Sequence, residues 1–339
     1  MPAQTNGNVP KGGKFVKKLL SIGLATLLAS AGVTAVQAQD YPTRPIALIN
    51  PYAAGGSADL IARTIAEYMG RTLGQPVVVE NRTGAATAIA ATYVAHAAPD
   101  GYTILLAGSP THVITPALNP AAGYNGIDDF AFVAAVASVP NVLVVSKESG
   151  ITSIDELAEK ALSAPDTVSY ASVGSGSLPH LTALMFSQRI GAQMLHIPYA
   201  GVAPATVDIL AGNVDTGFLN APPLIAHIQS GDMIPLAVAA TKRASLLPDV
   251  QTMGELGYGD YEMGTWYGVS APAGTPADVI AKLDAAIAEA LDNPEVQERL
   301  QQSGVDIFYK STPEFIDFIK ADAETVLGLI ETSGVEGAQ

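Results

Sequence analysis

From Ile46 onward, two patterns of apolar and polar positions alternate along the chain, one typical of buried strands and the other of amphipathic helices. Short uninterrupted apolar runs, such as Ile46–Ile49 and Tyr102–Leu106, are typical of buried strands. Apolar residues at helical spacing follow such runs, first from Leu60 to Met69 after the turn Pro51–Ser57. Because strands that alternate with helices form βαβ units, the pattern predicts an α/β fold with mostly parallel sheets flanked by helices.

The same pattern places the remaining elements and divides them into two lobes. Strands are predicted over 77–79, 142–145, 167–171, 194–198, 214–219, 234–240, 266–270 and 305–309. Helices are predicted over 85–98, 153–163, 179–190, 202–211, 222–230, 276–291, 294–303 and 313–331. The C-terminal helices have no sheet of their own to cover, so we expect them to return to the first block. Two crossing strands, 142–146 and 266–270, would then join lobe 1 (39–140 plus 264–339) to lobe 2 (141–263), and such lobes can bend at a hinge.

The first forty residues have the pattern of an export signal. Lysines between Lys11 and Lys18 precede an apolar run from Leu19 to Val36, and Ala38 ends the segment. This pattern predicts a signal peptide over 1–38 that is cleaved after Ala38, and hence a periplasmic protein. Retention of the run as a membrane anchor is the alternative, which its small and hydroxyl residues disfavour.

Composition excludes several classes of function. The chain has no cysteine, which removes disulfides, thiolate catalysis, thiolate metal ligands and a lipid-modified cysteine anchor. Because the net charge is −15, we expect no binding to nucleic acid or to anionic lipid. A negatively charged ligand would therefore need local hydrogen-bond donors, and backbone N–H groups at helix starts supply them.

Three loops, each between a predicted strand and a predicted helix, are candidate ligand sites. They are Gly55–Asp59, Asn81–Thr87 and Ser172–Ser177. Their glycines let a ligand approach the backbone closely, and open α/β sheets bind ligands at the carboxyl ends of strands. Each loop is also compatible with an ordinary structural turn that caps the following helix.

The histidines and the single tryptophan leave two interpretations each. None of the five histidines has metal-binding spacing, and we expect neither a metal nor a cofactor. His180 lies beside the loop Ser172–Ser177, where it either lines a cleft or serves as a structural hydrogen-bonding residue. Trp266 lies on the second crossing strand, where it either reports on lobe closure or packs at the hinge.

An ordered set of motifs resembles the Bug-type receptors of tripartite tricarboxylate transporters. The motifs are Ala54–Asp59, Val79–Ala85, Pro99–Thr103, Gly174–Ser177 with His180, Ile197–Gly201, Leu247–Thr252, Trp266–Gly268 and Ala271–Pro276. The resemblance implies a two-lobed type II periplasmic-binding-protein fold. It also implies a receptor, not an enzyme, that holds a small organic carboxylate by backbone amides and ordered water and works with the membrane subunits of the transporter. We expect the receptor to be a monomer without a lipid anchor.

By matching position, the resemblance implies ligand contacts in both lobes. In lobe 1 the implied contacts are Gly55, Gly56, Ser57, Asp59, Gly84, Ala85, Thr87 and Thr111. In lobe 2 they are Ser172, Gly174, Ser177, His180, Tyr199, Gly201, Ala203 and Asn220. The chain departs from the family pattern at Thr83, Ala86, Thr87 and Leu219. These departures indicate a ligand with more apolar or aromatic surface than usual.

Two other functions stay open on sequence grounds. Ser57 lies in a near match to the nucleophile elbow G-x-S-x-G, with Asp59 where glycine is required, so an exported serine hydrolase is one alternative. A ligand sensor that docks on a membrane signalling protein is the other, and its ligand binding would look the same.

Overall fold

The computed structural model describes residues 1–7, 41–259, 261 and 263–333. Most of the predicted signal peptide, residues 8–38, lies outside this part of the chain. Contacts divide the chain into the units 1–41 and 42–339, and the architecture below is that of the second unit. Within the described ranges, no helix is long and apolar enough to cross a membrane.

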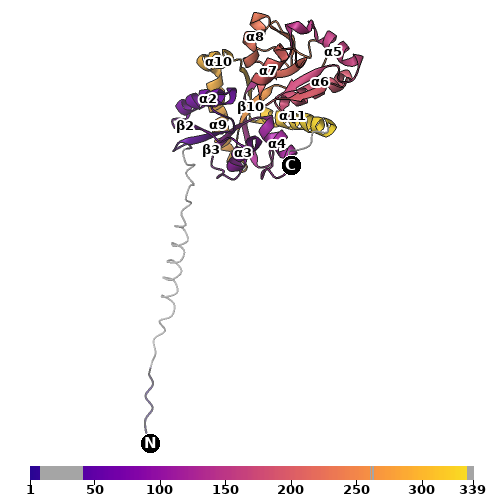
Figure 1. The fold of residues 1–339 in the computed structure, drawn as a ribbon. Coiled ribbons are helices and arrows are strands. Elements are labelled where there is room, and N and C mark those ends of the chain that lie inside the picture. Colours follow the sequence, from indigo (N-terminus) through magenta and orange to yellow (C-terminus); the bar gives the residue numbers. More distant parts are fainter. Residues whose placement is uncertain (8–40, 260, 262, 334–339) are drawn as a thin grey trace. The chain divides into compact units, whose positions relative to one another are not determined.

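The first sheet has six strands in the order β11-β4-β10-β3-β1-β2 (Figure 1). They are β1 (Ile46–Asn50), β2 (Val77–Asn81), β3 (Thr103–Ala107), β4 (Phe130–Val139), β10 (Thr265–Pro272) and β11 (Asp306–Lys310). β1 pairs in parallel with β2 and β3, whereas β10 is antiparallel to both β3 and β4, and β11 is antiparallel to β4. The sheet is mixed where the sequence predicted a mostly parallel one, because β10 and β11 run opposite to the other four strands.

The second sheet has five strands in the order β7-β6-β8-β5-β9. They are β5 (Asn141–Ser146), β6 (Ser169–Ser172), β7 (Leu195–Pro198), β8 (Thr216–Asn220) and β9 (Met233–Val238). β6 is parallel to β7 and β8, and β5 is antiparallel to β8 and β9, so this sheet is also mixed.

Helices flank both sheets (Figure 1). In lobe 1 they are α2 (Ser57–Leu73), η1 (Ala85–Thr87), α3 (Ala88–Ala95), η2 (Pro110–Ile114), α4 (Thr115–Leu118), α9 (Ala277–Asp292) and α10 (Pro294–Gln301). In lobe 2 they are η3 (Lys147–Ser149), α5 (Ile154–Ser163), α6 (Leu178–Ile190), α7 (Val202–Leu210), η4 (Pro222–Leu224) and α8 (Ile225–Ser230). Ends are set locally: α2 stops at Gly74, whose φ of 68° is left-handed, and Ser153 caps α5 by accepting the Glu156 N–H.

The chain passes from the first sheet to the second at Pro140, between β4 and β5, and returns just before β10. Asn141 is fully buried and donates from Nδ2 to the Met263 carbonyl at 2.8 Å, which ties the outgoing and returning segments together. The predicted crossing strands correspond to β5 and β10. The sequence analysis missed β4, the strand that pairs with β10 along its whole length.

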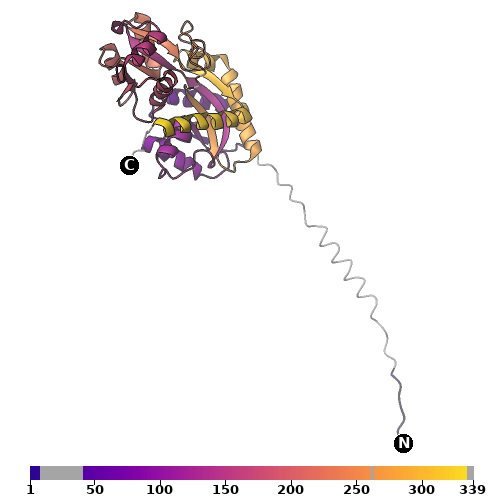
Figure 2. The ribbon, with the colours of Figure 1, turned by 90° about the vertical axis from the view of Figure 1, so that its right-hand side faces the viewer.

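The C-terminal helix α11 (Thr312–Ser333) contacts the cores of both lobes (yellow in Figure 2). Phe315 and Ile319, near its start, pack into the core of the first sheet, whereas Val326 and Leu329 pack into a lobe 2 core. Gln188 Nε2 on α6 also donates to Thr332 Oγ1 at 3.1 Å. A closing motion of the lobes must therefore accommodate α11 as well as the two crossings.

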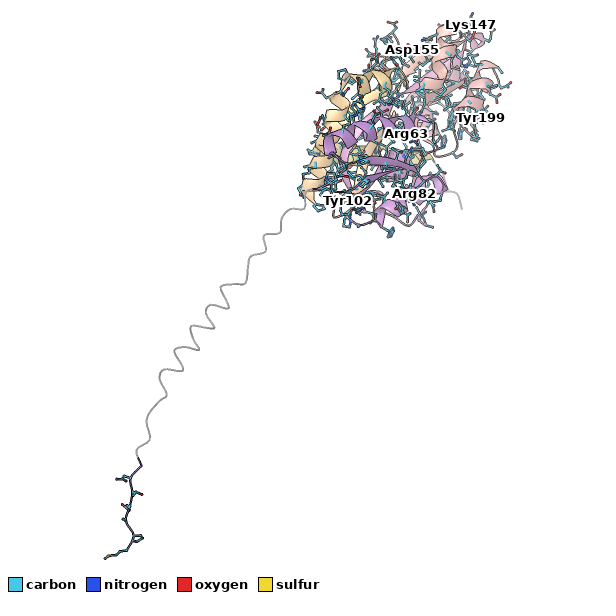
Figure 3. The ribbon with its side chains drawn as sticks, turned by 90° about the vertical axis from the view of Figure 1, so that its left-hand side faces the viewer. Arg63, Arg82, Tyr102, Lys147, Asp155 and Tyr199 are labelled. Atoms are coloured by element: carbon cyan, nitrogen blue, oxygen red, sulfur yellow. The ribbon has the colours of Figure 1, made fainter. Side chains whose placement is uncertain are left out.

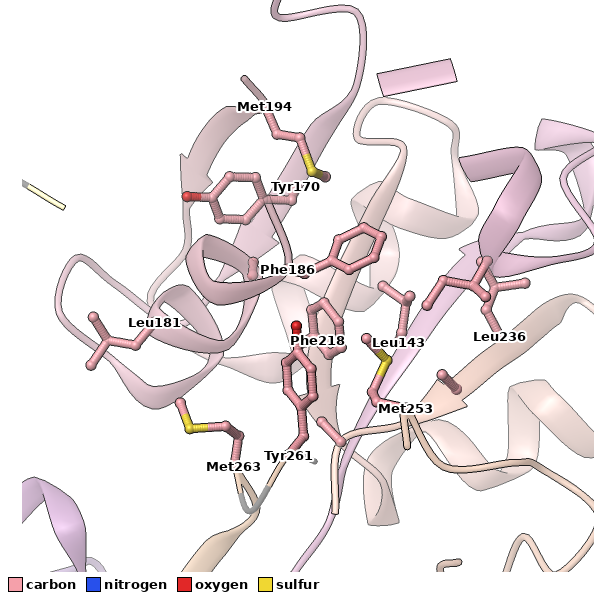
Figure 4. Packing of buried hydrophobic residues seen from close by; sticks show 14 of the residues in the cluster. Leu143, Tyr170, Leu181, Phe186, Met194, Phe218, Leu236, Met253, Tyr261 and Met263 are labelled. Carbon is pink, nitrogen blue, oxygen red and sulfur yellow. The ribbon is translucent and has the colours of Figure 1, made fainter. Parts of the chain in front are cut away.

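Each lobe has its own aromatic core. In lobe 2, Phe186 on α6 and Phe218 on β8 meet with ring centroids 5.9 Å apart (Figure 4). In lobe 1, Trp266 packs edge-to-face on Phe315 and Phe318, each at 5.5 Å. Trp266 is thus a packing residue at the start of β10, directly after the chain has returned from lobe 2.

Candidate functional site

A cleft of about 790 Å³ opens between loops of the two lobes. Lobe 1 and the return crossing line it with Tyr52, Ala85, Ala86, Thr87, Pro110, Ile114, Thr115, Leu118, Asn119 and Thr265. Lobe 2 lines it with Val173, Ser175, Gly176, Ser177, Leu178, Pro179, Val202 and Asn220. This volume suits a small organic molecule. Among the described residues, none with a charged side chain lies on the wall of the cleft.

The lobe 1 wall contains a turn of three successive left-handed residues. Ala85, Ala86 and Thr87 have φ values of 45°, 49° and 81°. This conformation costs a residue other than glycine about 1–2 kcal/mol. Thr115 Oγ1 holds the turn by donating to the Ala86 carbonyl at 2.6 Å, and the Thr87 N–H donates to the Gly84 carbonyl at 3.0 Å. The helix predicted over 85–98 therefore becomes regular only from Ala88.

Two buried hydroxyl groups beside this turn, those of Thr87 and Tyr52, make no well-formed hydrogen bond in the described part of the chain. Each still has a polar neighbour, since Thr87 lies close enough to Tyr124, and Thr111 close enough to Tyr52, to oppose part of the rise in that tyrosine's pKa. Thr87 is only 8% exposed. Burial raises the pKa of Tyr52 to about 12, against a smaller opposite effect of the neighbouring Thr111 hydroxyl, so Tyr52 stays protonated at any physiological pH. Both hydroxyl oxygens have almost no exposed surface in this structure, so they would donate to a ligand only after the side chains rotate. They belong to the same wall as the Ala85 and Ala86 amides, which precede the first turn of the helix and have no carbonyl in it to bond.

The lobe 2 loop between β6 and α6 uses most of its donors internally. The Gly174 N–H donates to Ser172 Oγ at 3.1 Å, and the Ser177 N–H donates to the Gly174 carbonyl at 3.1 Å. Ser177 Oγ donates to the same carbonyl at 2.6 Å, and the Gly176 N–H donates to His180 Nδ1 at 3.0 Å. The two facing loops therefore differ, since the one in lobe 1 keeps free donors and the one in lobe 2 consumes them.

A stack of rings supports the lobe 2 loop from behind. The His180 and His196 rings lie 3.9 Å apart, and Tyr170 stacks on His196 at 5.0 Å. Ser172 Oγ and His196 Nε2 are 2.6 Å apart. Burial, with a smaller contribution from His196, lowers the pKa of His180 to about 4, so its neutral ring can accept the Gly176 N–H. In this structure His180 is buried, lies off the cleft wall and supports the loop through its bond to Gly176.

The buried histidines predict that the protein loses stability on mild acidification. Burial lowers the pKa of both His112 and His180 to about 4. Because unfolded histidine titrates near 6.5, the unfolded chain binds more protons between these values. The free energy of unfolding should therefore fall as the pH drops from about 6.5 to about 4, by up to about 1.4 kcal/mol per pH unit for each imidazole. Urea unfolding at several pH values should show that the free energy of unfolding depends less steeply on pH in His180→Gln than in the unchanged protein. An equally steep dependence would contradict the burial of a neutral His180 in the folded state.

Two residues of the predicted site have their polar groups engaged elsewhere. Asp59 accepts hydrogen bonds from Arg63 Nε at 2.9 Å, from Asn81 Nδ2 at 2.9 Å and from the Gly55 N–H at 3.0 Å. The Arg63 guanidinium holds the pKa of Asp59 well below its usual range. Tyr199 donates its hydroxyl to Asp208 Oδ2 at 2.7 Å. Figure 3 labels Arg63 in lobe 1 and Tyr199 in lobe 2.

The structure brings part of the predicted site to the cleft wall. The predicted residues that line the cleft are Ala85, Thr87, Ser177 and Asn220. Those that do not line it are Gly55, Gly56, Ser57, Asp59, Gly84, Thr111, Ser172, Gly174, His180, Tyr199, Gly201 and Ala203. Ligand contact by any of these residues stays a prediction. Leu219, where the family commonly has Asp, is buried in the lobe 2 core, away from the wall.

The sequence analysis missed most of the apolar part of the wall. Ile114, Leu118 and Val202 lie in none of the three predicted loops, and only the fold brings them to the wall. Val173 lies inside the predicted loop Ser172–Ser177 but was not itself predicted as a contact. Tyr52 was within reach of sequence reasoning, because it lies in the same turn as Gly55 and Gly56.

The described residues show no assembled set of catalytic or metal-ligating side chains. Ser57 Oγ has no imidazole or carboxylate partner there, and Ser172, which does contact His196, has no exposed surface. No group of three or more His, Cys, Asp or Glu side chains comes together in these ranges in a way that could hold a metal ion.

Comparisons with known proteins agree along almost the whole chain. The model of a family described as "Tripartite tricarboxylate transporter family receptor" matches residues 61–335. Protein BugT of Bordetella pertussis is 36% identical over 321 residues, which cover 94% of this chain and 98% of BugT. A solved R. palustris protein with adipate is 31% identical with a TM-score of 0.74, covering 87% of this chain and 99% of that one. MatC from Rhodopseudomonas palustris with bound malate is 31% identical with a TM-score of 0.70, covering 86% of this chain and 100% of that one.

Proposed function

Since this chain belongs to the family of tripartite tricarboxylate transporter receptors, we propose that it is a periplasmic receptor that captures a small organic carboxylate between its two lobes. Membership confirms the predicted family, and solved relatives described as a periplasmic binding protein and a TctC solute-binding protein confirm the predicted two-lobed α/β fold. The family is one of solute-binding receptors and not of enzymes. Two similar proteins were solved with the carboxylates adipate and malate, which supports a carboxylate here.

The observation that carries the proposal is the donor set of the cleft. The Ala85 and Ala86 amides and the hydroxyls of Thr87 and Tyr52 lie on one wall, and charged side chains are absent from the described lining. Neutral donors fixed in a low-dielectric site stabilise a carboxylate without an ion pair. Such a site works despite the strongly acidic composition, because distant charges are screened by salt while the local donors are not.

We propose that the two lobes have the bounds predicted from the sequence, and that the predicted ligand contacts away from the cleft wall are also correct. Residues 39–140 with 264–339 form lobe 1, residues 141–263 form lobe 2, and the crossings at Pro140 and before Thr265 are the hinge. The predicted site residues off the wall in this structure, such as Gly55, Gly201 and Ala203, would approach the ligand when the lobes close. Their position in loops next to lining residues supports this assignment.

The proposed cellular setting follows from the N-terminal pattern and the family. The signal peptide 1–38 is removed on export, and the absence of cysteine leaves the mature receptor without a lipid anchor. The receptor is a monomer without cofactor, binds no nucleic acid, and delivers its ligand, which has apolar or aromatic surface, to the membrane subunits of a tripartite tricarboxylate-type transporter.

Calorimetric titration of the mature chain, 39–339, against a panel of carboxylates tests the proposal. We expect saturable one-site binding of at least one member. A change in tryptophan fluorescence should accompany it, because Trp266 adjoins Thr265 on the cleft wall. A protein that is folded by circular dichroism and binds no member of the panel would refute the receptor function.

A further inference from the structure

On the basis of the receptor function proposed above, we infer that the cleft is built for a monocarboxylate with an apolar body. The carboxylate lies at the turn Ala85–Thr87 in lobe 1, and the hydrocarbon lies against the apolar side chains of both lobes. The two solved relatives described above hold dicarboxylates, so this specificity sets the present chain apart from them.

One end of the cleft is equipped for a carboxylate. The turn Ala85–Thr87 presents the Ala85 and Ala86 amides, and its geometry is held by the bond from Thr115 Oγ1. Thr87, which is more than nine-tenths buried, and Tyr52 both line the cleft. Their hydroxyls make no well-formed hydrogen bond in the described residues and would reach the carboxylate by rotation of the side chains. Two amides and two hydroxyls match the acceptor positions of one carboxylate.

The other end is poorly equipped for a second carboxylate. The amides of Gly174, Gly176 and Ser177 and the Ser177 hydroxyl already donate within their own loop or to His180. Pro179, in the first turn of α6, has no N–H to offer. The start of α6 keeps only the amides on either side of this proline, and the exposed loop residue is Ser175. The other donors of this wall are the Asn220 side-chain amide and the Val202 N–H at the start of α7, and all of them are neutral. A second negative charge would have to leave water for this sparse set of donors, without a cation on the described wall.

The surface between the two ends is apolar. Ile114 and Leu118 contribute from lobe 1, and Val173, Leu178 and Val202 contribute from lobe 2. Burying one methylene group in such surroundings strengthens binding by about fourfold. An alkyl chain or ring therefore gains affinity from both lobes at once, and so favours their closure.

Titration with the matched pair hexanoate and adipate tests the inference, since the two differ only by the second carboxylate. We expect hexanoate to bind about tenfold tighter or better, because the extra charge of adipate loses its hydration without replacement. Affinity should also rise along butanoate, hexanoate and octanoate. Equal or tighter binding of adipate would overturn the inference and leave the receptor function standing, whereas failure of every carboxylate would overturn both.

An isosteric variant locates the apolar subsite. Val173→Thr replaces a methyl group on the wall by a hydroxyl of similar shape and should weaken hexanoate binding about three- to tenfold. The matched control is Val207→Thr on α7, since Val207 is 63% exposed and off the wall. Equal hexanoate affinity of the two variants would contradict the assignment of Val173 to the ligand's body.

Discussion

Replacing Thr87 by valine is expected to weaken carboxylate binding about ten- to a hundredfold without destabilising the ligand-free protein. A hydrogen bond to a charged group contributes about 1.5–3 kcal/mol, which corresponds to this loss of affinity. In the ligand-free protein the Thr87 hydroxyl is buried and makes no well-formed hydrogen bond in the described residues, with Tyr124 as its polar neighbour. Valine, which has the same branching and nearly the same shape, should therefore not destabilise the fold. Calorimetry and urea unfolding of the same variant measure both effects.

Thr115→Val is the matched control for this experiment. The Thr115 hydroxyl does have a partner, the Ala86 carbonyl at 2.6 Å, and this bond holds the left-handed turn. Its loss should lower the free energy of unfolding by about 1–2 kcal/mol. If Thr87→Val instead destabilised the protein as much as Thr115→Val, the Thr87 hydroxyl would be a structural group and not a donor kept for a ligand.

Replacing Gly268 by alanine should cause a large loss of stability, about 3 kcal/mol. Gly268 lies on β10, where an added Cβ would overlap the Phe315 ring and approach the Ala134 carbonyl to 3.0 Å. Phe315 cannot retreat, because it is buried against Phe132 and Trp266. The strand that carries the chain back from lobe 2 would therefore be displaced, which urea or thermal unfolding measures.

A second glycine provides the control for steric overlap. Gly328 lies in α11 with nothing within 4 Å of the position of an added Cβ, so Gly328→Ala should raise stability by up to about 1 kcal/mol. In addition, Phe315→Leu should recover part of the stability lost in Gly268→Ala, because it vacates the overlapped volume. Equal stability of the two alanine variants would contradict the close packing of Gly268 on β10 against Phe315 on α11.

Local patterns predicted most helices and strands, because each element must bury an apolar face of characteristic period. The sequence analysis did not predict the strand β4, because its alanine-rich run is buried at nearly every position and shows no alternation of apolar and polar residues. The segment 110–118, which folds as η2 and α4, is interrupted by Pro110 and Pro116 and gave no periodic signal. Strand direction was misjudged for a different reason, since it depends on where the chain crosses between lobes and not on local sequence.

The sequence could predict which loops form the site, but not the backbone conformation of those loops. Ala85 and Thr87 came from the resemblance, yet their left-handed backbone runs against the preference of both residue types and rests on Thr115 in a later segment. Asp59 also came from the resemblance, and in this structure its carboxylate is engaged by Gly55, Arg63 and Asn81. The arginine one turn later, Arg63, was a visible sign that this carboxylate is engaged within the helix.

The salt dependence of carboxylate binding tests the central claim most directly, namely that neutral donors in an interlobe cleft hold the anion. Calorimetric titration of the mature chain should be run at low salt and at about 1 M salt, where the Debye length is about 3 Å. We predict saturable binding whose affinity changes by less than about threefold, because no charged side chain of the described wall pairs with the ligand. An affinity that falls by about tenfold or more with salt, as for an exposed ion pair, would contradict the account.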